Sequence, residues 1–203
     1  MKYFVILFLL FSSLSTLGQD ICCRTFNIYI GKVKEITDVV SNSYGQSQIR
    51  TTTFDESGRI LSQSSGDFKY TYYWCADSTE IECVLSEMDK DAVVNKAYVY
   101  VNTYSDSELD YEIGDVSYHI DFNANRSINK SKIKQNKNIL ETQYVYNDGN
   151  NLYPYKVVQK SGSQTMVTYI SVKKVDEYNN LLEFSQTSNG VTLTTKRTIT
   201  YYK

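Results

Sequence analysis

The feature that most constrains this chain is a tight turn followed by an alternating aromatic strand, between Phe54 and Trp74. Asp55 stands at the first position of the turn and Gly58 at the fourth. An Asp at the first position accepts hydrogen bonds from the following backbone, and Gly adopts a positive φ without a steric cost. Every second residue of the strand is then aromatic: Phe68, Tyr70, Tyr72 and Trp74. This period of two predicts a β-strand with all four rings on one face.

Later stretches carry the same turn, less perfectly each time. The residues at the Asp and Gly positions are Asn147 with Asn150, and Asp176 with Asn179. After Gly, Asn is the residue that best tolerates a left-handed conformation. A weaker copy spans Phe122–Ile128, where Arg126 holds the Gly position. A turn that recurs along the chain in this way is typical of repeat arrays in which each unit is one supersecondary element. We therefore expect the turns at Asp55, Asn147 and Asp176 to lie along one edge of a continuous antiparallel sheet.

The pattern aromatic-Asp-x-x-Gly-Arg-hydrophobic, then a polar stretch and Tyr-x-Tyr, resembles the YD repeat of RHS-type proteins. It is most similar to the short secreted relatives found in the Bacteroidota. The similarity is good over Thr51–Trp74 and weaker over Gln143–Tyr169 and Tyr169–Tyr202. The resemblance implies an array of β-hairpins and not an encapsulated toxin.

The first residues have the pattern of an export signal. Lys2 precedes the apolar run Tyr3–Phe11, and small residues follow as far as Gly18. The run is too short for a membrane-spanning helix, which needs about 20 apolar residues. We predict a signal peptide over residues 1–18 and a single β-repeat domain over residues 19–203. The mature chain is expected to be exported to the periplasm, the cell surface or the medium, without a membrane span.

The composition favours strands throughout the mature chain. Nineteen tyrosines and eight phenylalanines accompany a single proline. We predict an all-β fold, an antiparallel meander of tandem hairpins that forms a twisted open sheet or a partly rolled sheet, with little or no helix. Four local expectations follow: a hairpin over Phe26–Val40 around Gly31, a short helix or a loop over Val84–Asp91, an exposed connection over Lys130–Asn138, and a final strand Arg197–Tyr202 pairing with Val191–Thr195 or the strand before it.

The single histidine does not form a catalytic triad. Ser117, His119 and Asp121 share one strand face. Neighbours on such a face stand about 7 Å apart in line. A triad instead needs both ring nitrogens hydrogen-bonded at once, normally by residues from different loops. We therefore predict that the protein is not an enzyme.

No metal or cofactor pattern is present in the sequence. The acidic window Asp106–Asp115 could collect a calcium ion, but Tyr111 stands where an EF-hand requires Gly and Ser117 where it requires Glu. A charged strand or loop exposed to water is the simpler interpretation. No phosphate-binding or dinucleotide fingerprint occurs, and we predict no cofactor. The net charge of −2 gives no electrostatic reason to expect a nucleic acid partner.

Three functions remain open from the sequence alone. The favoured one is a non-catalytic exported β-repeat protein with a structural or surface-interaction role and an unknown partner. The alternative is a glycan-binding module that uses Tyr72, Tyr73 and Trp74. Exposed aromatic rings suit the apolar faces of sugars, whereas aromatic ladders in a sheet more often pack in a core. A hydrolase with carboxylates at its site is the weakest candidate.

Four cysteines in an exported chain are disulfide candidates, and their spacing does not suit zinc. We predict a bond between Cys75 and Cys83, which would stabilise the protein by roughly 2–3 kcal/mol, mainly by restricting the unfolded chain. Cys22 and Cys23 are adjacent, and their pairing is left open. Peptide mapping without reduction should recover Cys75 joined to Cys83; a link from Cys23 to either one would contradict the prediction.

Overall fold

The computed structural model describes residues 31–74, 80–87, 92–105, 107–124, 127–147 and 152–203. Within these ranges every regular element is a β-strand, and the fourteen strands form one antiparallel sheet. The predicted all-β meander is therefore confirmed. None of the described residues belongs to a helix long and apolar enough to cross a membrane.

The strands follow one another at short intervals along the chain. They are β1 (Val33–Asn42), β2 (Ser47–Phe54), β3 (Ile60–Ser65), β4 (Phe68–Trp74), β5 (Glu80–Glu87), β6 (Ala92–Tyr104), β7 (Glu108–Ile113), β8 (Val116–Phe122), β9 (Ile128–Gln135), β10 (Asn138–Val145), β11 (Lys156–Ser161), β12 (Gln164–Val175), β13 (Leu181–Ser188) and β14 (Val191–Tyr201).

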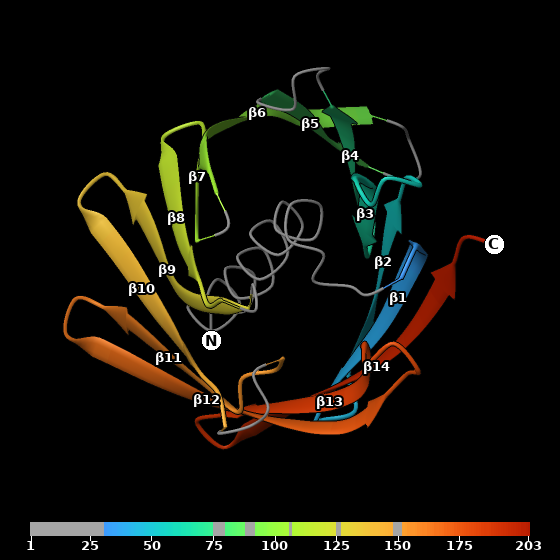
Figure 1. Ribbon diagram of the computed structural model, residues 1–203, viewed down its shortest axis with the longest axis vertical. Helices are drawn as coiled ribbons and strands as arrows, with labels where there is room; N and C mark the ends of the chain where they lie inside the picture. The colour runs from blue at the N-terminus through green and yellow to red at the C-terminus, as the bar shows by residue number, and fades with distance from the viewer. Residues whose placement is uncertain (1–30, 75–79, 88–91, 106, 125–126, 148–151) are drawn as a thin grey trace.

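The sheet rolls until its two ends meet. Each strand pairs with its neighbours in sequence, and β14 also pairs with β1, from Val33 opposite Tyr201 to Asn42 opposite Leu193. The result is a closed barrel, seen end-on as a ring of strands in Figure 1. The sequence predicted an open or partly rolled sheet, whereas the pairing of β14 with β1 closes it. Closure pairs strands that would otherwise present free edges.

The expectation for the final strand was wrong. β14 is one continuous strand of eleven residues, so Arg197–Tyr201 does not turn back onto Val191–Thr195. Nor does this half pair with β13, whose partners end at Lys196. It pairs with β1 instead. No Gly, Pro or Asn interrupts residues 191–201, so the chain has no local signal for a turn there.

Two other local expectations are corrected by the pairing. Lys130–Gln135 lies in β9, because its lysines alternate with a period of two and face outward. Val84–Glu87 belongs to β5, which pairs with both β4 and β6; sheet pairing there overrides a weak helix preference. The first arm of the predicted Phe26–Val40 hairpin, residues 26–30, lies outside the described residues; its second arm falls in β1, which pairs with β14 and β2.

Burial alternates along the strands and distinguishes two faces of the sheet. On β14, Thr195 is buried, while Lys196 and Thr198, which point to the opposite face, are exposed. The buried side chains pack into one core cluster. Its members are Val33, Ile36, Phe54, Ile60, Tyr72, Val99, Leu109, Tyr111, Ile120 and Phe122. We call the face that carries this cluster the inner face, and the opposite one the outer face.

The inner face is apolar on one side of the ring and polar on the other. The core cluster comes from β1–β4 and β6–β8. On the remaining strands the buried polar residues include Thr142, Thr168 and Thr195. Between β14 and β1, Arg197 makes a bidentate ion pair with Asp38, with distances of 2.6 and 2.8 Å. We call the junction of β1 and β14 the seam, and this ion pair links its two strands on the inner face.

Deleting Thr198–Lys203 should destabilise the protein far more than terminal fraying would. The deletion removes half of the β1–β14 pairing and exposes Ile36 at the seam. At about 1 kcal/mol for each lost hydrogen bond, plus the lost burial, the free energy of unfolding should fall by more than about 2 kcal/mol. Urea unfolding measures this free energy of unfolding, and the control removes only the exposed Lys203. Equal midpoints for the two truncations would show that the seam contributes little.

Candidate functional site

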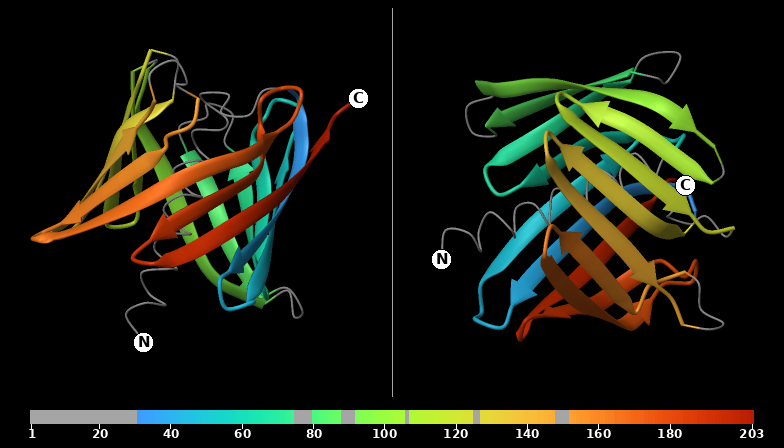
Figure 2. Two further views of the ribbon diagram at one scale, coloured as in Figure 1. Left: turned by 90° about the horizontal axis from the view of Figure 1, so that it is seen from below. Right: turned by 90° about the vertical axis from the view of Figure 1, so that its left-hand side faces the viewer.

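The two ends of the barrel differ in the length of their connections. At one end, five of the hairpins turn in two residues: 66–67, 114–115, 136–137, 162–163 and 189–190. Apart from the short connection at 105–107, the other end carries longer ones, at 55–59, 75–79, 123–127, 146–155 and 176–180, together with the start of β1 and the end of β14. We call this the long-loop edge. The strands run obliquely between the two edges (Figure 2).

The repeat turns lie on the long-loop edge. Because successive strands alternate in direction, Asp55 after β2, Asn147 after β10 and Asp176 after β12 all stand at the same end of the sheet. The weaker copy at 123–127 stands there too. Asn150 lies outside the described residues. The predicted alignment of these turns along one sheet edge therefore matches the topology.

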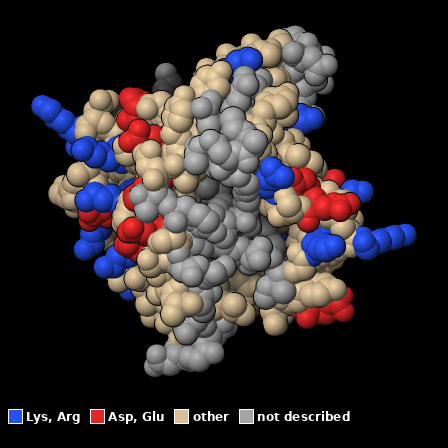
Figure 3. Space-filling view, turned by 45° about the horizontal axis from the view of Figure 1, so that its top comes forward, with Lys and Arg blue, Asp and Glu red and all other residues tan. Residues whose placement is uncertain are grey.

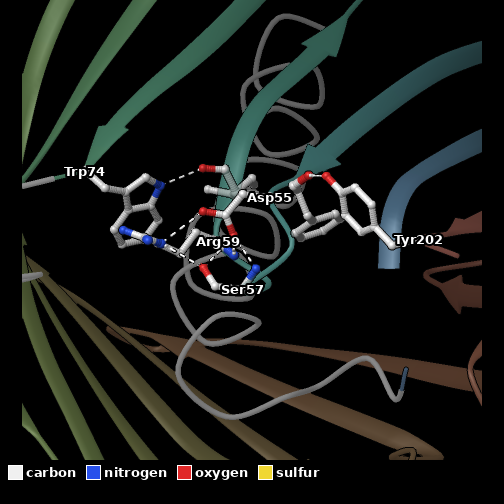
Figure 4. A network of polar contacts seen from close by, with 7 residues as sticks. Asp55, Ser57, Arg59, Trp74 and Tyr202 are labelled. Carbon is white, nitrogen blue, oxygen red and sulfur yellow. Dashed lines mark hydrogen bonds and ion pairs between the residues drawn. The ribbon is translucent and has the colours of Figure 1, made fainter. Parts of the chain in front are cut away.

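The Asp55 turn is organised by the Asp carboxylate. Its Oδ1 accepts hydrogen bonds from the backbone N–H of Ser57 at 2.9 Å and of Arg59 at 2.8 Å. The Asp55 N–H donates to the Arg59 carbonyl at 2.8 Å, and Gly58 has φ 81°. The Arg59 side chain returns to Asp55 in an ion pair of 3.0 Å (Figure 4). Burial raises the pKa of Asp55, but these hydrogen bonds and Arg59 outweigh it and hold the pKa below its ordinary value.

The Asp176 turn repeats this geometry. Its Oδ1 accepts from the N–H groups of Tyr178 at 2.9 Å and Asn180 at 2.7 Å. The Asp176 N–H donates to the Asn180 carbonyl at 2.9 Å, and Asn179 has φ 64° at the Gly position. Asn179 thus adopts a positive φ, as Gly58 does in the Asp55 turn, and the sequence pattern predicted this.

A third copy of the turn was missed by sequence reasoning. In Asn42–Gln46, the Asn42 side chain accepts from the N–H groups of Tyr44 and Gln46, and Gly45 has φ 81°. The signal was present, since Gly45 stands at the Gly position. This copy differs from the Asp55 unit, because Asn replaces Asp and no aromatic strand follows. This copy joins β1 to β2 at the opposite edge, so the turn is a local device and not a mark of one edge.

Side chains from distant strands hold the Asp55 loop. The Tyr202 hydroxyl donates to the Phe54 carbonyl at 2.6 Å, and the Trp74 indole N–H donates to the Ile60 carbonyl at 2.6 Å (Figure 4). Both acceptors flank the turn. The C-terminal residues and the end of β4 therefore fix where this loop sits.

The Asp176 loop is held in the same manner. The Tyr201 hydroxyl donates to the Asp176 carboxylate, and the Asn180 side-chain N–H donates to that hydroxyl at 2.9 Å. The Tyr178 ring packs on Tyr201 with 4.9 Å between centroids. Burial, followed by the contact with Asp176, raises the pKa of Tyr201 to about 12. Tyr153 donates its hydroxyl to the Asn179 carbonyl, which joins this loop to the 146–155 connection.

Large apolar side chains are exposed around these two connected loops. Tyr178, at 39% exposure, belongs to the Asp176 loop, and Leu152, at 47%, and Tyr155, at 38%, belong to the 146–155 connection. On the strand that leads into the loop, Tyr169, Val172 and Val175 are also exposed. Tyr169 and Val172 lie an odd number of residues apart in regular register and so on opposite faces of β12. We therefore call only the three loop residues, Tyr178, Leu152 and Tyr155, the rim patch. They sit on backbone that is fixed by the contacts above.

The tentative glycan platform does not form one surface. Tyr72 is 5% exposed and donates its hydroxyl to Gln63 at 2.6 Å, whereas Tyr73 is 56% exposed on the outer face. Trp74 packs with Tyr70 against the core cluster. Adjacent residues of a strand point to opposite faces, so Tyr72, Tyr73 and Trp74 cannot stack on one ligand.

The predicted disulfide falls largely outside the described residues. Cys75 lies there, as do Cys22 and Cys23. The backbone of Cys83 belongs to β5 and pairs with Tyr72, but its side chain is not described.

His119 is clamped by two carboxylates and not by a serine. Its Nδ1 lies 2.6 Å from Asp110 and its Nε2 lies 3.3 Å from Asp121. The cross-strand partner Asp110 comes from the acidic window, most of which forms β7 with Leu109 and Tyr111 buried. Among the described residues no group of three or more His, Cys, Asp or Glu side chains could hold a metal ion. The cluster is arranged to stabilise a charged imidazole.

This clamp predicts a pH dependence of stability. The hydrogen bond with Asp110 raises the pKa of His119, although burial opposes it. The contribution is therefore full below the unfolded pKa of about 6.5 and is lost as pH rises through the higher folded pKa. Because the side chain is 40% exposed, we expect less than about 1 kcal/mol. Unfolding free energies at about pH 5.5 and 8.5 should differ less in His119→Gln, which removes the only histidine. An unchanged pH difference in that variant would contradict the prediction.

Comparisons with known proteins give no family. No family model and no curated protein match the chain. The fold is similar to the crystal structure of a porin-like protein from Bacteroides vulgatus, with a TM-score of 0.44 and 11% sequence identity. The alignment covers 81% of this chain and 97% of that chain. The resemblance to RHS-type YD repeats accordingly stays a prediction from the motif.

Proposed function

We propose that this protein is an exported, non-catalytic β-barrel whose long-loop edge binds a protein partner at the cell surface. The observation that carries the proposal is the rim patch. Soluble monomers expose apolar side chains mostly singly, and a cluster of them is typical of an interaction surface. Export rests on the signal-like pattern of residues 1–18.

The fixed backbone beneath the patch supports this role. Asp176, Asn180 and Tyr201 hold one loop, and Tyr153 joins the other to it. A surface that is already ordered loses little conformational entropy when a partner binds. Binding residues are commonly carried on loops that a rigid scaffold positions.

The titratable groups support a non-catalytic role. The carboxylates of Asp55 and Asp176 are occupied by their own turns. His119 is occupied on both nitrogens. These groups stabilise local structure, and none of the three is offered to a substrate.

Site-specific photo-crosslinking tests the proposal with a matched pair of positions. Tyr178 and Tyr44 hold the same place in the same kind of turn, but at opposite edges of the barrel. A photoreactive phenylalanine analogue at Tyr178 or Tyr155 should yield one discrete protein adduct in producing cells. The same analogue at Tyr44, which is 79% exposed, should yield none.

Substitution gives the complementary result. Adding Leu152→Ser to a chain with the analogue at Tyr155 should abolish the adduct, whereas adding Tyr44→Ser should leave it. Because Tyr178 packs on Tyr201, Tyr178→Ser is used only after its urea midpoint is measured. Equal adducts at both edges, or none at either, would overturn the proposal.

A further inference from the structure

Charged side chains on the outer face are sorted strand by strand. β7 turns Glu108, Asp110 and Glu112 outward, since Leu109 and Tyr111 between them are fully buried. In register, Asp110 opposes His119 on β8, and His119 opposes Lys132 on β9. Residues opposed in this way share a face, so an acidic column and a lysine column stand two strands apart on the same wall.

The lysine column is three residues long and has a parallel neighbour. Lys130, Lys132 and Lys134 alternate along β9, all exposed. Lys132 opposes Glu141 on β10, and Glu141 opposes Lys160 on β11. Lys156 lies on the same side of β11, and Lys137 lies in the β9–β10 turn. We call Lys130, Lys132, Lys134, Lys137, Lys156 and Lys160 the lysine strip.

The strip is open and only partly neutralised. Within the described part of the chain, Lys132 is the member that makes an ion pair, with Glu141 at 3.2 Å. Lys130 faces Asp121, but that carboxylate also contacts His119. The right-hand view of Figure 2 presents this wall of β8–β11, and Figure 3 shows blue and red side chains gathered along the flanks of the molecule. The wall carries a local positive charge although the whole chain has a net charge of −2.

We propose that the lysine strip binds a linear polyanion, specifically an acidic polysaccharide. Lysines on β9 repeat about every 7 Å along the strand, and the β9 and β11 columns lie about 10 Å apart. This arrangement offers ammonium groups on both sides of one extended chain. Each lysine is a compact charge without the planar fork of arginine, so the strip suits repeated carboxylate or sulfate groups.

The acidic column argues against a flat anionic surface, such as a membrane, as the ligand of the strip. Asp110 and Glu112 stand about 10 Å from the β9 lysines, two strand spacings away. A membrane plane laid on this wall would bring its negative headgroups against them, within a Debye length. A single polysaccharide chain is narrow enough to follow the strip and avoid the column. The strip borders the rim patch at Lys156, which follows Tyr155 in the chain. Substitutions at Lys130, Lys134 and Lys160 leave that border unchanged, so the two proposals are tested separately.

Binding to polyuronate and to sulfated oligosaccharides of defined length tests the inference, measured by titration calorimetry at two salt concentrations. The triple variant Lys130→Gln, Lys134→Gln, Lys160→Gln removes charges that make no ion pair, so the fold should be unaffected. Affinity should fall about tenfold or more, and its salt dependence should weaken with each lysine removed. The matched control Lys69→Gln, Lys174→Gln, Lys196→Gln removes three exposed lysines elsewhere.

One variant should act in the opposite direction. Glu141→Gln removes the carboxylate inside the strip and should tighten binding several-fold, whereas Glu56→Gln, in an exposed turn, should not. A preference for uronate or for sulfate identifies the anion, and either one supports the inference. Equal binding by the triple variant, no binding to either oligosaccharide, or tighter binding to phosphatidylglycerol vesicles or a single-stranded oligonucleotide would overturn it.

Discussion

The pairing of β1 with β14 is the constraint on which the rest of this structure depends. Unpaired backbone groups along a sheet edge are costly when buried and attract other strands when exposed. Closing the ring satisfies them, and it also places the core cluster from β1–β4 and β6–β8 on a common inner face. The Asp38–Arg197 pair lies across this seam, with both side chains less than one-fifth exposed. Such a pair specifies register more reliably than it adds stability, since removing either partner would leave a charge poorly solvated.

The second organising device is the Asx turn, used at Asn42, Asp55 and Asp176. In each copy one side-chain oxygen satisfies two backbone N–H groups, and a residue with positive φ completes the reversal. The device is sequence-local, so it works at either edge. The copies differ in which distant side chains hold the loop in place. Tyr202 reaches the Asp55 loop and Tyr201 the Asp176 loop, which links the last residues of the chain to both.

The sequence could predict what is decided locally. The Asp–Gly and Asp–Asn turns, the all-β class and the alignment of the turns along one edge follow from residue types and strand parity. Closure could not be predicted, because the β1–β14 contact has no local signature. The basic composition of Lys130–Asn138 favours an exposed connection, but its lysines alternate with the period of two that a strand requires. The same period already implied that Tyr72 and Tyr73 point to opposite faces, so the glycan platform could have been rejected from the sequence.

The closed seam also sets an order of events for the chain. Asp38 and Arg197 are 159 positions apart, so β1 is synthesised long before its partner β14 exists. Until β14 is present, β1 can pair only with β2. Its other edge stays unpaired while the hairpins between β1 and β14 form. Closing a loop of this length is a slow, entropically costly step, and topologies dominated by such contacts fold late and expose edges meanwhile. The proposed export of the chain before the ring closes would keep the unpaired edge of β1 out of the cell interior.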